Sequence, residues 1–538
     1  MQILHRTILF RVCLTSWSGI CSGLTYQVNQ PLYRAGLMGV AKPLSNRRDG
    51  RQTGVSVIRF NLNGRWIESS EIDPNCTILK FLRTNLKQVD VKEGCAAGDC
   101  GACTIMLGQM TEHGIEYQTL NACIALMANV HDRYLLTSSG IGRAGKLHPA
   151  QQALVDCHGS QCGFCTPGFV MSMANLQQNA CKAPGHIPDV AEIHEALSGN
   201  LCRCTGYRPI IEAAQRMHEL PQQNLEDISL RSGVQTFDPR DAEQPLLEAN
   251  GRRLFMPESE AQLKALLALY PHARLWAGGT DAGLEITQRF TQFDTIICVN
   301  RVAELTRCSE PGQDADDQLW LGACVTFSQA EKLLAESFPS FAQLLHRIGS
   351  RQIRNMGTLG GNIANASPIG DTPPVFFALD AILEIDGIHG RREVAIGDFY
   401  LGYKQTVLQP GEYLRALRIP KLKATEHLWL HKVSKRYDDD ISAVMFALYL
   451  SVEGGVISSA RLACGGMAAT PKLAEKTNAA LSGKHFAVSS FEQAAAFIDQ
   501  DYQPISDVRA SDQYRLQVTR NLLIKAFHDM TTAQGDAA

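Results

Sequence analysis

Hydrophobic and polar residues alternate where the regular pattern of the chain begins. Ile58, Phe60 and Leu62 alternate with polar positions before Asn63-Gly64, which predicts a half-buried strand entering a hairpin. The period then becomes helical, at Ile78, Leu79, Leu82 and Leu86. Hairpin, helix and further strands predict a first small domain over residues 56–135.

A longer helical pattern follows in residues 136–221. From Pro149 onward, apolar residues recur at helical spacing in about four groups, the first at Ala153 and Leu154 and the last near Ile210. Two glycine-containing segments, 159–163 and 199–206, interrupt these groups. We therefore expect an all-helical second domain with two loops at helix ends.

The remaining chain divides into three regions. Residues 222–245 are polar and poorly periodic, which indicates a linker. Strands alternate with helices over 246–425, and 426–535 begins with strand-like segments such as 444–452 and ends in helices. The fold class predicted is therefore α+β and multidomain.

Two glycine segments lie in the region 246–425. They are Leu275-Trp276-Ala277-Gly278-Gly279-Thr280-Asp281-Ala282, after a predicted strand, and Thr358-Leu359-Gly360-Gly361-Asn362. Neither contains the GxGxxG fingerprint of a Rossmann sheet. One Gly-Gly pair is more often a turn than a phosphate site, but two pairs bordered by Thr, Asp and Asn favour pyrophosphate binding by amides and hydroxyls.

Composition and charge exclude several classes of protein. The chain has 538 residues, enough for several domains, with 20% charged and 45% hydrophobic residues. Its net charge of -3, with both signs interleaved, suggests neither a nucleic-acid face nor an acidic tail. We expect no transmembrane helix, because no apolar run reaches ~18 residues.

Residues 1–55 differ from the rest. Positions 1–48 carry Arg and Lys but no Asp or Glu, a bias that is typical of targeting peptides. A non-native or mis-started extension explains the bias equally well. We expect a disordered, dispensable extension.

Eight of the seventeen cysteines form two candidate ligand sets. The first is Cys95-x4-Cys100-x2-Cys103, completed by Cys123, the spacing of plant-type [2Fe-2S] ferredoxins. It predicts that the first domain is a ferredoxin-like β-grasp. The second is Cys162-x2-Cys165 with Cys202-x-Cys204, at the helix ends of the second domain.

Zinc binding and disulfide formation are the alternative uses of these cysteines. Paired CxxC units are more often zinc ribbons, so zinc stays open for the second set taken by itself. The gaps of the first set are not those of zinc knuckles. The other nine cysteines are scattered singly, often beside apolar residues, as reduced thiols are. This usage indicates a reducing, cytoplasmic location.

The sequence resembles the small subunit of the xanthine dehydrogenases, in the molybdenum hydroxylase family, from about residue 56 to 535. The most specific stretches are 94–103, 159–168 and 199–209, which hold seven of the eight cysteines. The resemblance implies a β-grasp [2Fe-2S] domain, a helical [2Fe-2S] domain, a vanillyl-alcohol-oxidase-type FAD domain and a C-terminal α+β flavoprotein domain.

The resemblance also implies FAD contacts. Residues 275–282 match the family's first pyrophosphate loop and 358–362 the second, while Asp371, Leu414 and Lys432 match further contacts. Tyr403 matches an aromatic residue over the flavin face. The run 436–440 matches a loop that influences whether NAD or oxygen is the acceptor, although a cluster of charges is ordinarily a solvated loop.

The implied function is electron transfer. Electrons from a molybdopterin-binding partner that hydroxylates purines would pass through the helical-domain cluster, the β-grasp cluster and FAD to NAD, with Gln161 near the pterin. The family expectation is a heterotetramer of two small and two large chains, and no catalytic acid, base or nucleophile is expected in this chain. The alternatives are the same module serving an aldehyde- or carbon monoxide-oxidising partner, or an iron–sulfur redox carrier or sensor.

Overall fold

A five-stranded sheet forms the first part of the structure. The computed structural model describes residues 57–143, 145–182, 186–235, 237, 243–308 and 317–535, so the predicted extension 1–55 lies outside the described residues. The strand order is β2-β1-β5-β3-β4, with β1 and β5 parallel and the other pairs antiparallel. The bounds are β1 Ile58–Leu62, β2 Arg65–Ser69, β3 Thr104–Thr111, β4 Gly114–Asn121 and β5 Tyr134–Leu136.

Helix α1 (Ile78–Thr84) belongs to this sheet domain. The Thr77 side chain caps it by accepting a hydrogen bond from the Lys80 N–H. Ile78, Leu79 and Leu82 are buried as predicted, whereas Leu86 lies beyond the end of the helix. Hairpin, helix and cysteine loop thus follow one another in the predicted order.

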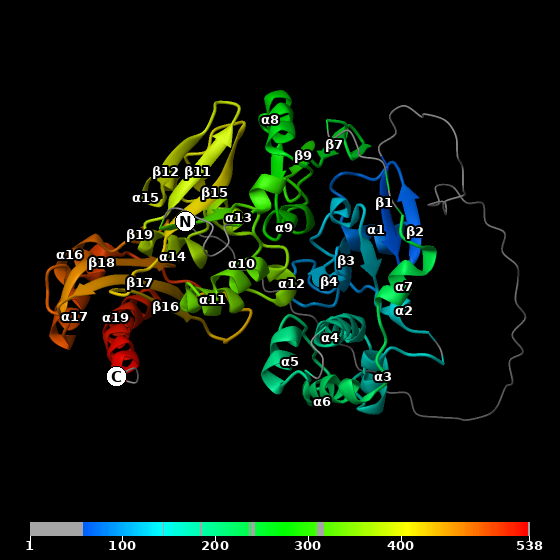
Figure 1. Cartoon of the computed structure of the whole chain (residues 1–538), viewed down its shortest axis with the longest axis horizontal. Helices are drawn as coiled ribbons and strands as arrows, with labels where there is room; N and C mark the ends of the chain where they lie inside the picture. The colour runs from blue at the N-terminus through cyan, green and yellow to red at the C-terminus, as the bar shows by residue number, and fades with distance from the viewer. Residues whose placement is uncertain are drawn as a thin grey trace, which may run out of the picture. The chain divides into compact units, whose positions relative to one another are not determined.

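The predicted helical region contains the four helices expected from its period. They are α3 (Pro149–Asp156), α4 (Thr166–Ala180), α5 (Val190–Leu197) and α6 (Arg208–Arg216), after the short α2 (Ser138–Ile141). Figure 1 shows α3 to α6 gathered in one group, and α4 packs against β3 and β4. A buried apolar core joins these helices to the face of the sheet that carries Met106 and Leu136.

The predicted linker, 222–245, contains short helical elements that the sequence pattern did not predict. Helix α7 (Glu226–Ser229) and a 3-10 helix η3 (Leu230–Ser232) lie within it. Leu225 and Ile228 are buried, and the Tyr117 hydroxyl donates a 2.7 Å hydrogen bond to Ser229. Two apolar residues are too few to reveal a helical period, so the sequence pattern missed this element.

Two sheets and several helices build the region after the linker. The first sheet has the order β6-β7-β9-β8 and the second β10-β15-β11-β12. The strands are β6 Leu247–Ala249, β7 Arg252–Phe255, β8 Arg274–Trp276, β9 Thr295–Cys298, β10 Gln318–Gly322, β11 Ile382–Gly387, β12 Arg392–Ala395 and β15 Glu412–Pro420. A short hairpin consists of β13 (Tyr400–Gly402) and β14 (Gln405–Thr406).

The helices of this region follow the strands in the expected alternation. They are α8 Glu260–Leu269, α9 Ala282–Thr287, α10 Phe327–Leu334, α11 Pro339–His346, α12 Arg351–Arg354, α13 Leu359–Ala364, α14 Thr372–Ala378 and α15 Ile396–Phe399. Trp276 on β8 and Leu254 on β7 share one buried core with Ile78 and Leu126 of the first domain. The sheet β6-β7-β9-β8 and the first domain are therefore packed directly on each other.

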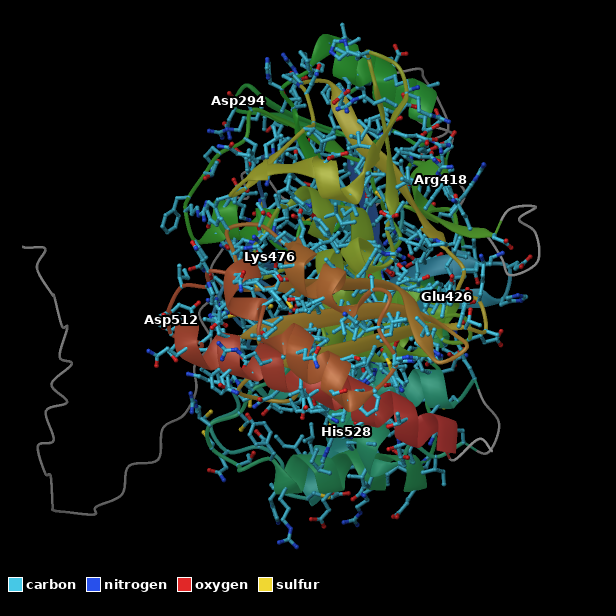
Figure 2. The ribbon with its side chains drawn as sticks, turned by 90° about the vertical axis from the view of Figure 1, so that its left-hand side faces the viewer. Asp294, Arg418, Glu426, Lys476, Asp512 and His528 are labelled. Atoms are coloured by element: carbon cyan, nitrogen blue, oxygen red, sulfur yellow. The ribbon has the colours of Figure 1, made fainter. Side chains whose placement is uncertain are left out.

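The last region is a four-stranded antiparallel sheet covered by helices. Its strands are β16 Glu426–Val433, β17 Val444–Glu453, β18 Val456–Gly465 and β19 Lys472–Leu473, in that order. Its helices are α16 Glu475–Leu481, α17 Val488–Ala495, α18 Ile498–Asp501 and α19 Asp512–Gly535. Figure 2 shows α19 running across this sheet from Asp512 past His528, and Leu522 and Leu523 of that helix are buried. None of the described helices combines the length and apolar character that crossing a membrane requires.

Candidate cofactor sites

The first cysteine loop turns its backbone toward sulfur. Cys95 Sγ accepts hydrogen bonds from the N–H groups of Ala97 (3.3 Å), Asp99 (3.3 Å) and Cys100 (3.4 Å). The Cys95 N–H in turn donates to Cys100 Sγ at 3.3 Å. Gly98 has a φ of +83°, and a Cβ there would lie 2.8 Å from Ile124. N–H groups aimed at sulfur stabilise thiolates, which is what a cluster ligand must be.

The four cysteines of the first set lie together. Cys103 and Cys123 are buried, whereas Cys95 and Cys100 are half-buried. Hydrogen bonding by the Cys100 thiol, and then by that of Cys123, lowers the pKa of Cys95. Hydrogen bonding to Cys103, then to Cys95, raises the pKa of Cys123. These contacts connect all four side chains, as the predicted ligand set requires.

The second set is more exposed. Cys162 and Cys204 are exposed, Cys165 is half-buried and Cys202 is buried. The N–H of Phe164, then the Cys204 thiol, lowers the pKa of Cys162. Burial, then the Cys202 thiol, raises the pKa of Cys165 to about 12. The structure therefore brings these cysteines together as two contacting pairs, with Cys165 at the N-cap of α4.

The pairing of thiols bears on the kind of metal centre. In the described parts of the chain, no three His, Cys, Asp or Glu side chains converge as ligands of one metal ion. A binuclear cluster does not need such a group, because each iron takes two protein thiolates and two bridging sulfides. The donor set fits two [2Fe-2S] clusters, with the sets Cys95, Cys100, Cys103, Cys123 and Cys162, Cys165, Cys202, Cys204 as predicted ligands.

The two cysteine loops touch each other. The Leu201 N–H donates to the Cys100 carbonyl oxygen at 3.0 Å. Gly101 and Gly199 are so close that a Cβ on Gly101 would lie 2.2 Å from the Gly199 carbonyl oxygen. A ligand of the first set is therefore one backbone hydrogen bond away from the residue that precedes Cys202.

The two glycine segments of the FAD-type region are also adjacent. A Cβ on Gly278 would lie 1.9 Å from the Met356 carbonyl oxygen, two residues before Thr358. Gly279 has a φ of +71°, and a Cβ there would lie 2.2 Å from Trp276 Nε1, a buried atom with no hydrogen-bond partner. The bare backbone of both glycines is thus required by close packing, and it leaves amide groups free of side-chain cover.

The second segment differs in form from the prediction. Thr358 is the N-cap of α13, and its side chain accepts a 3.0 Å hydrogen bond from the Gly361 N–H. Leu359, Gly360, Gly361 and Asn362 therefore lie in the first turns of a helix, not in a loop. Gly360 fits there because a Cβ would lie 2.5 Å from that of Ala323, and this packing overrides the low helix propensity of glycine.

Two of the other predicted FAD contacts, Asp371 and Lys432, belong to one buried polar group. Lys432 Nζ lies 2.7 Å from Asp371 Oδ2, and Ser442 donates a 2.6 Å hydrogen bond to Asp371 Oδ1. Leu414 lies on β15 of the second sheet and is buried in its core, and Tyr403 is exposed in the turn between β13 and β14. Ser442 was not predicted from the sequence, because a lone serine carries no signal.

Lys404 is a second residue that the sequence analysis missed. Its Nζ donates to Asn365 Oδ1 at 2.7 Å and lies 3.6 Å from Asp281 Oδ2. It thus links the end of the first glycine segment to the residue that ends α13. Only the fold brings these positions together.

The charged run 436–440 is anchored on one side. The Arg347 guanidinium lies over the Tyr437 ring, 4.2 Å from its centroid, and donates to the Tyr437 and Lys432 carbonyl oxygens. Burial, then the charge of Asp99 beside the first cysteine loop, raises the pKa of Asp439 to about 7. Asp439 is therefore close enough to the first cysteine loop to interact with Asp99, whereas Arg436, Tyr437 and Asp438 are exposed, as charged clusters usually are.

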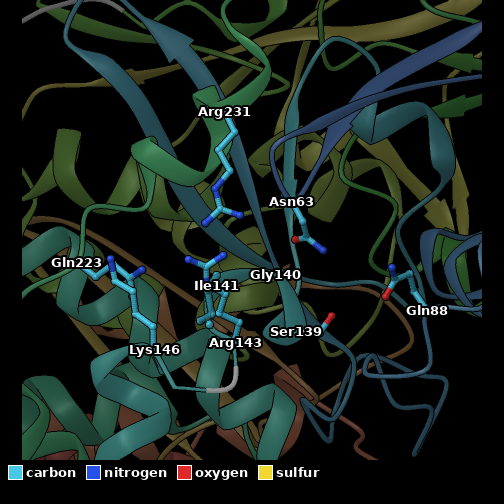
Figure 3. A pocket seen from close by; sticks show the side chains of 10 residues that line it. Asn63, Gln88, Ser139, Gly140, Ile141, Arg143, Lys146, Gln223 and Arg231 are labelled. Carbon is cyan, nitrogen blue, oxygen red and sulfur yellow. The ribbon is translucent and has the colours of Figure 1, made fainter. Parts of the chain in front are cut away.

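Two cavities differ in their place, one beside the predicted FAD contact Lys432 and one away from the predicted cofactor residues. One of about 570 Å³ is lined by α10, α11 and β16 and includes Lys432, Arg347 and Tyr437. The other, of about 300 Å³, lies between the β1–β2 turn and residues 139–146, with Arg143, Lys146 and Arg231 on its wall (Figure 3). The second cavity contains none of the predicted cofactor residues.

Four domain families match consecutive parts of the chain. They are the 2Fe-2S iron-sulfur cluster binding domain (residues 60–128), the [2Fe-2S] binding domain (137–215), the FAD binding domain in molybdopterin dehydrogenase (249–422) and the CO dehydrogenase flavoprotein C-terminal domain (429–530). They confirm the predicted fold class and the two [2Fe-2S] clusters and FAD as cofactors. The residues that contact those cofactors stay predictions.

Curated relatives agree with the domain families. Xanthine dehydrogenase of Drosophila subobscura is 33% identical over 488 residues, covering 80% of this chain and 36% of that protein. Xanthine dehydrogenase/oxidase of Gallus gallus is 30% identical over 530 residues, covering 84% and 38%. The chain thus spans little more than a third of the length of these relatives.

A carbon monoxide dehydrogenase from Hydrogenophaga pseudoflava has a chain that is 28% identical, with a TM-score of 0.48 over 51% of this chain and 95% of that one. The four consecutive domain matches, the order of the two cysteine sets and the relatives agree on one assignment. The chain belongs to the molybdenum hydroxylase family, as an iron–sulfur and FAD-binding member.

Proposed function

We propose that this chain is the electron-transfer subunit of a xanthine dehydrogenase. In this proposal a molybdopterin-binding partner converts hypoxanthine and xanthine to urate, and NAD is the acceptor. When bound, the clusters supply one-electron transfer and FAD couples it to a two-electron acceptor. The observation that carries the proposal is the continuous contact between the two cysteine loops, through Leu201 and Cys100, within one chain that also has the FAD-binding region.

In this proposal the residues of the chain bind the clusters and FAD and shield them from water, and none of them reacts chemically. The eight cysteines are the proposed iron ligands, and the N–H groups around Cys95 favour its thiolate. Residues 275–282 and 358–362 are the proposed pyrophosphate site, with Asp371, Leu414 and Lys432 as further FAD contacts. The Lys432 ammonium is fixed by Asp371 and by the Arg347 carbonyl oxygen at 3.1 Å, so it presents a positive charge of constant position.

The surface around the second cysteine set supports a separate partner. Cys162 and Cys204 are exposed, and the side chains of Phe164, Leu201 and Tyr207 beside them are 47%, 45% and 38% exposed. Exposed apolar side chains around exposed thiols are typical of a face that a partner covers. We propose that the molybdopterin-binding large subunit docks here, with exposed Gln161 toward the pterin, in a heterotetramer of two small and two large chains.

The acceptor side is proposed to lie at Tyr403. Its ring is 64% exposed in the β13–β14 turn, where it is free to stack on a nicotinamide. A cytoplasmic location is part of the proposal, because eight thiolates must stay reduced until iron is loaded.

The test is the identity and activity of the chain that copurifies with this one. We expect a molybdopterin-containing chain and NADH formation that depends on hypoxanthine or xanthine. Oxidation of aldehydes or carbon monoxide instead would favour the other molybdenum hydroxylases. Purified protein without stoichiometric FAD would contradict the proposal and favour an iron–sulfur carrier or sensor.

A further inference from the structure

A buried polar network lies where the two cysteine loops meet the FAD-binding region. Its centre is Gln352 of α12, whose side chain is fully buried. Gln352 Nε2 lies 3.1 Å from Thr104 Oγ1, 3.2 Å from Asn200 Oδ1 and 3.4 Å from Ser172 Oγ. The two N–H bonds of this one amide are therefore shared among three oxygen acceptors, which lie on elements that carry or adjoin the iron ligands.

The acceptors of Gln352 are coupled to the cysteine loops. Thr104 directly follows Cys103, and its hydroxyl donates to the Gly101 carbonyl oxygen at 2.7 Å. Asn200, two residues before Cys202, donates from Nδ2 to the same carbonyl oxygen at 3.1 Å. A shift of either loop therefore breaks hydrogen bonds that the other loop and Gln352 share.

The network is closed by helix α4 of the helical domain. Ser172 donates to Asn200 Oδ1 at 2.7 Å, and both residues are 2% exposed. Because water is excluded, a donor or acceptor that loses its partner here costs its full desolvation energy. The network thus favours one arrangement of the loops over slightly shifted ones.

Helix α12 is itself fixed against the helical domain. Arg351 and Arg354 both form ion pairs with Glu195 of α5, and Arg354 is 2% exposed. Asn355 donates to the Thr119 carbonyl oxygen of β4 at 2.9 Å. These bonds hold the helix against its neighbours, while Gln352 contacts the loops that follow or precede the cysteines.

We propose that Gln352 is a positioning residue that fixes the spacing of the two iron–sulfur sites and joins them to the FAD-binding region. The proposal rests on the proposed function, because the spacing of clusters matters only if electrons pass between them. Gln352 itself touches no cofactor. It acts through Thr104 and Asn200.

The test compares Gln352→Leu with a matched control in the full chain. Gln177→Leu removes another buried glutamine, whose Nε2 donates to the Met217 carbonyl oxygen at 3.1 Å within the helical domain. Ser172→Ala removes one hydroxyl of the network and is the replacement test variant if Gln352→Leu does not fold. Iron, sulfide and FAD contents are measured first, so that a failure of the proposed function is recognised before the variants are compared.

Two readouts do not depend on turnover. The first is amide hydrogen exchange of Leu201 and Thr104, whose N–H groups bond to Cys100 and Gly101. We expect about tenfold faster exchange in Gln352→Leu, the effect of losing one buried partner. The second is the magnetic interaction between the two clusters after dithionite reduction, which falls steeply with distance.

The expected result is faster exchange in both loops and a weaker or broadened cluster–cluster interaction in Gln352→Leu, with the same changes, smaller, in Ser172→Ala. Gln177→Leu should leave both readouts unchanged. Unchanged exchange and unchanged interaction in Gln352→Leu would overturn the proposal, and so would equal changes in the control. If the protein lacks clusters, the exchange experiment still decides whether Gln352 joins the loops.

Discussion

Replacing Lys432 by Met should open the junction between the FAD-binding region and the last sheet. Lys432 on β16 and Asp371 before α14 form an ion pair with a 2.7 Å N–O distance, and their side chains are 2% and 8% exposed. Met has nearly the length of Lys but no charge, so among the described residues the substitution leaves Asp371 with the Ser442 hydroxyl as its side-chain partner. The carboxylate then stays buried without a counter-charge.

The magnitude follows from that geometry. At 2.7 Å and an effective dielectric constant of about 20, the attraction between the two charges is about 6 kcal/mol, and desolvation offsets part of it. Removing one partner of a buried pair costs about 3–5 kcal/mol. A local loss of about 3 kcal/mol accelerates exchange of the β16 and β17 amides about 150-fold.

Native-state hydrogen exchange is the suitable assay, because a multidomain chain does not unfold in one step. Lys525→Met is the control: it removes an exposed pair with Asp529 on α19 and should change exchange by less than about fivefold. The double variant Lys432→Met/Asp371→Asn should recover most of the protection, because it leaves no unpaired charge. Additive effects of the two single substitutions would refute the reasoning.

Three further outcomes are expected. Cys162→Ser should halve the iron and abolish purine-dependent NADH formation with FAD still bound, whereas Cys181→Ser in the same helical region should change neither; full turnover in Cys162→Ser would refute the proposed route. Gly278→Ala places a Cβ 1.9 Å from a backbone carbonyl oxygen and should release FAD, measured by flavin absorbance after gel filtration, whereas Gly397→Ala meets no atom within 4 Å and should retain it. Burial lowers the pKa of His148 from 6.5 to about 4, so the unfolded chain takes up a proton at higher pH than the folded chain does. As the pH falls from about 6.5 to about 4, the unfolding free energy of the helical domain should therefore fall by about 1.4 kcal/mol per pH unit. A His148→Asn variant that keeps this pH dependence in hydrogen exchange would contradict the assignment.

Much of the fold could be predicted because its elements have long periodic patterns. The segment 444–452 is apolar at every position except Ser451 and lies within β17, which is buried on both faces as far as Ser451. Helix α7 could not be predicted, because it buries only a few residues and depends on Tyr117, more than a hundred positions away. The glycines of residues 358–362 indicate a loop, whereas the Thr358 cap and the packing of Gly360 against Ala323 explain why these residues start a helix.

The candidate cofactor sites likewise contain some residues that the sequence indicates and others that it does not. Cysteine spacing is fixed by cluster geometry and is visible in the sequence, so the amino-acid sequence alone indicates both ligand sets. Gln352 and Lys404 carry no local signal, since each acts through partners from distant segments. Long-range hydrogen bonds become evident only when the chain is folded.

The proposed function requires that one chain holds two [2Fe-2S] clusters and one FAD in electronic contact. An anaerobic dithionite titration of the purified chain, followed by absorbance and electron paramagnetic resonance, tests it most directly. We expect uptake of about four electrons per chain, one for each cluster and two for the flavin, with bleaching of both chromophores. A colourless protein that takes up no electrons and gives no paramagnetic signal would contradict it.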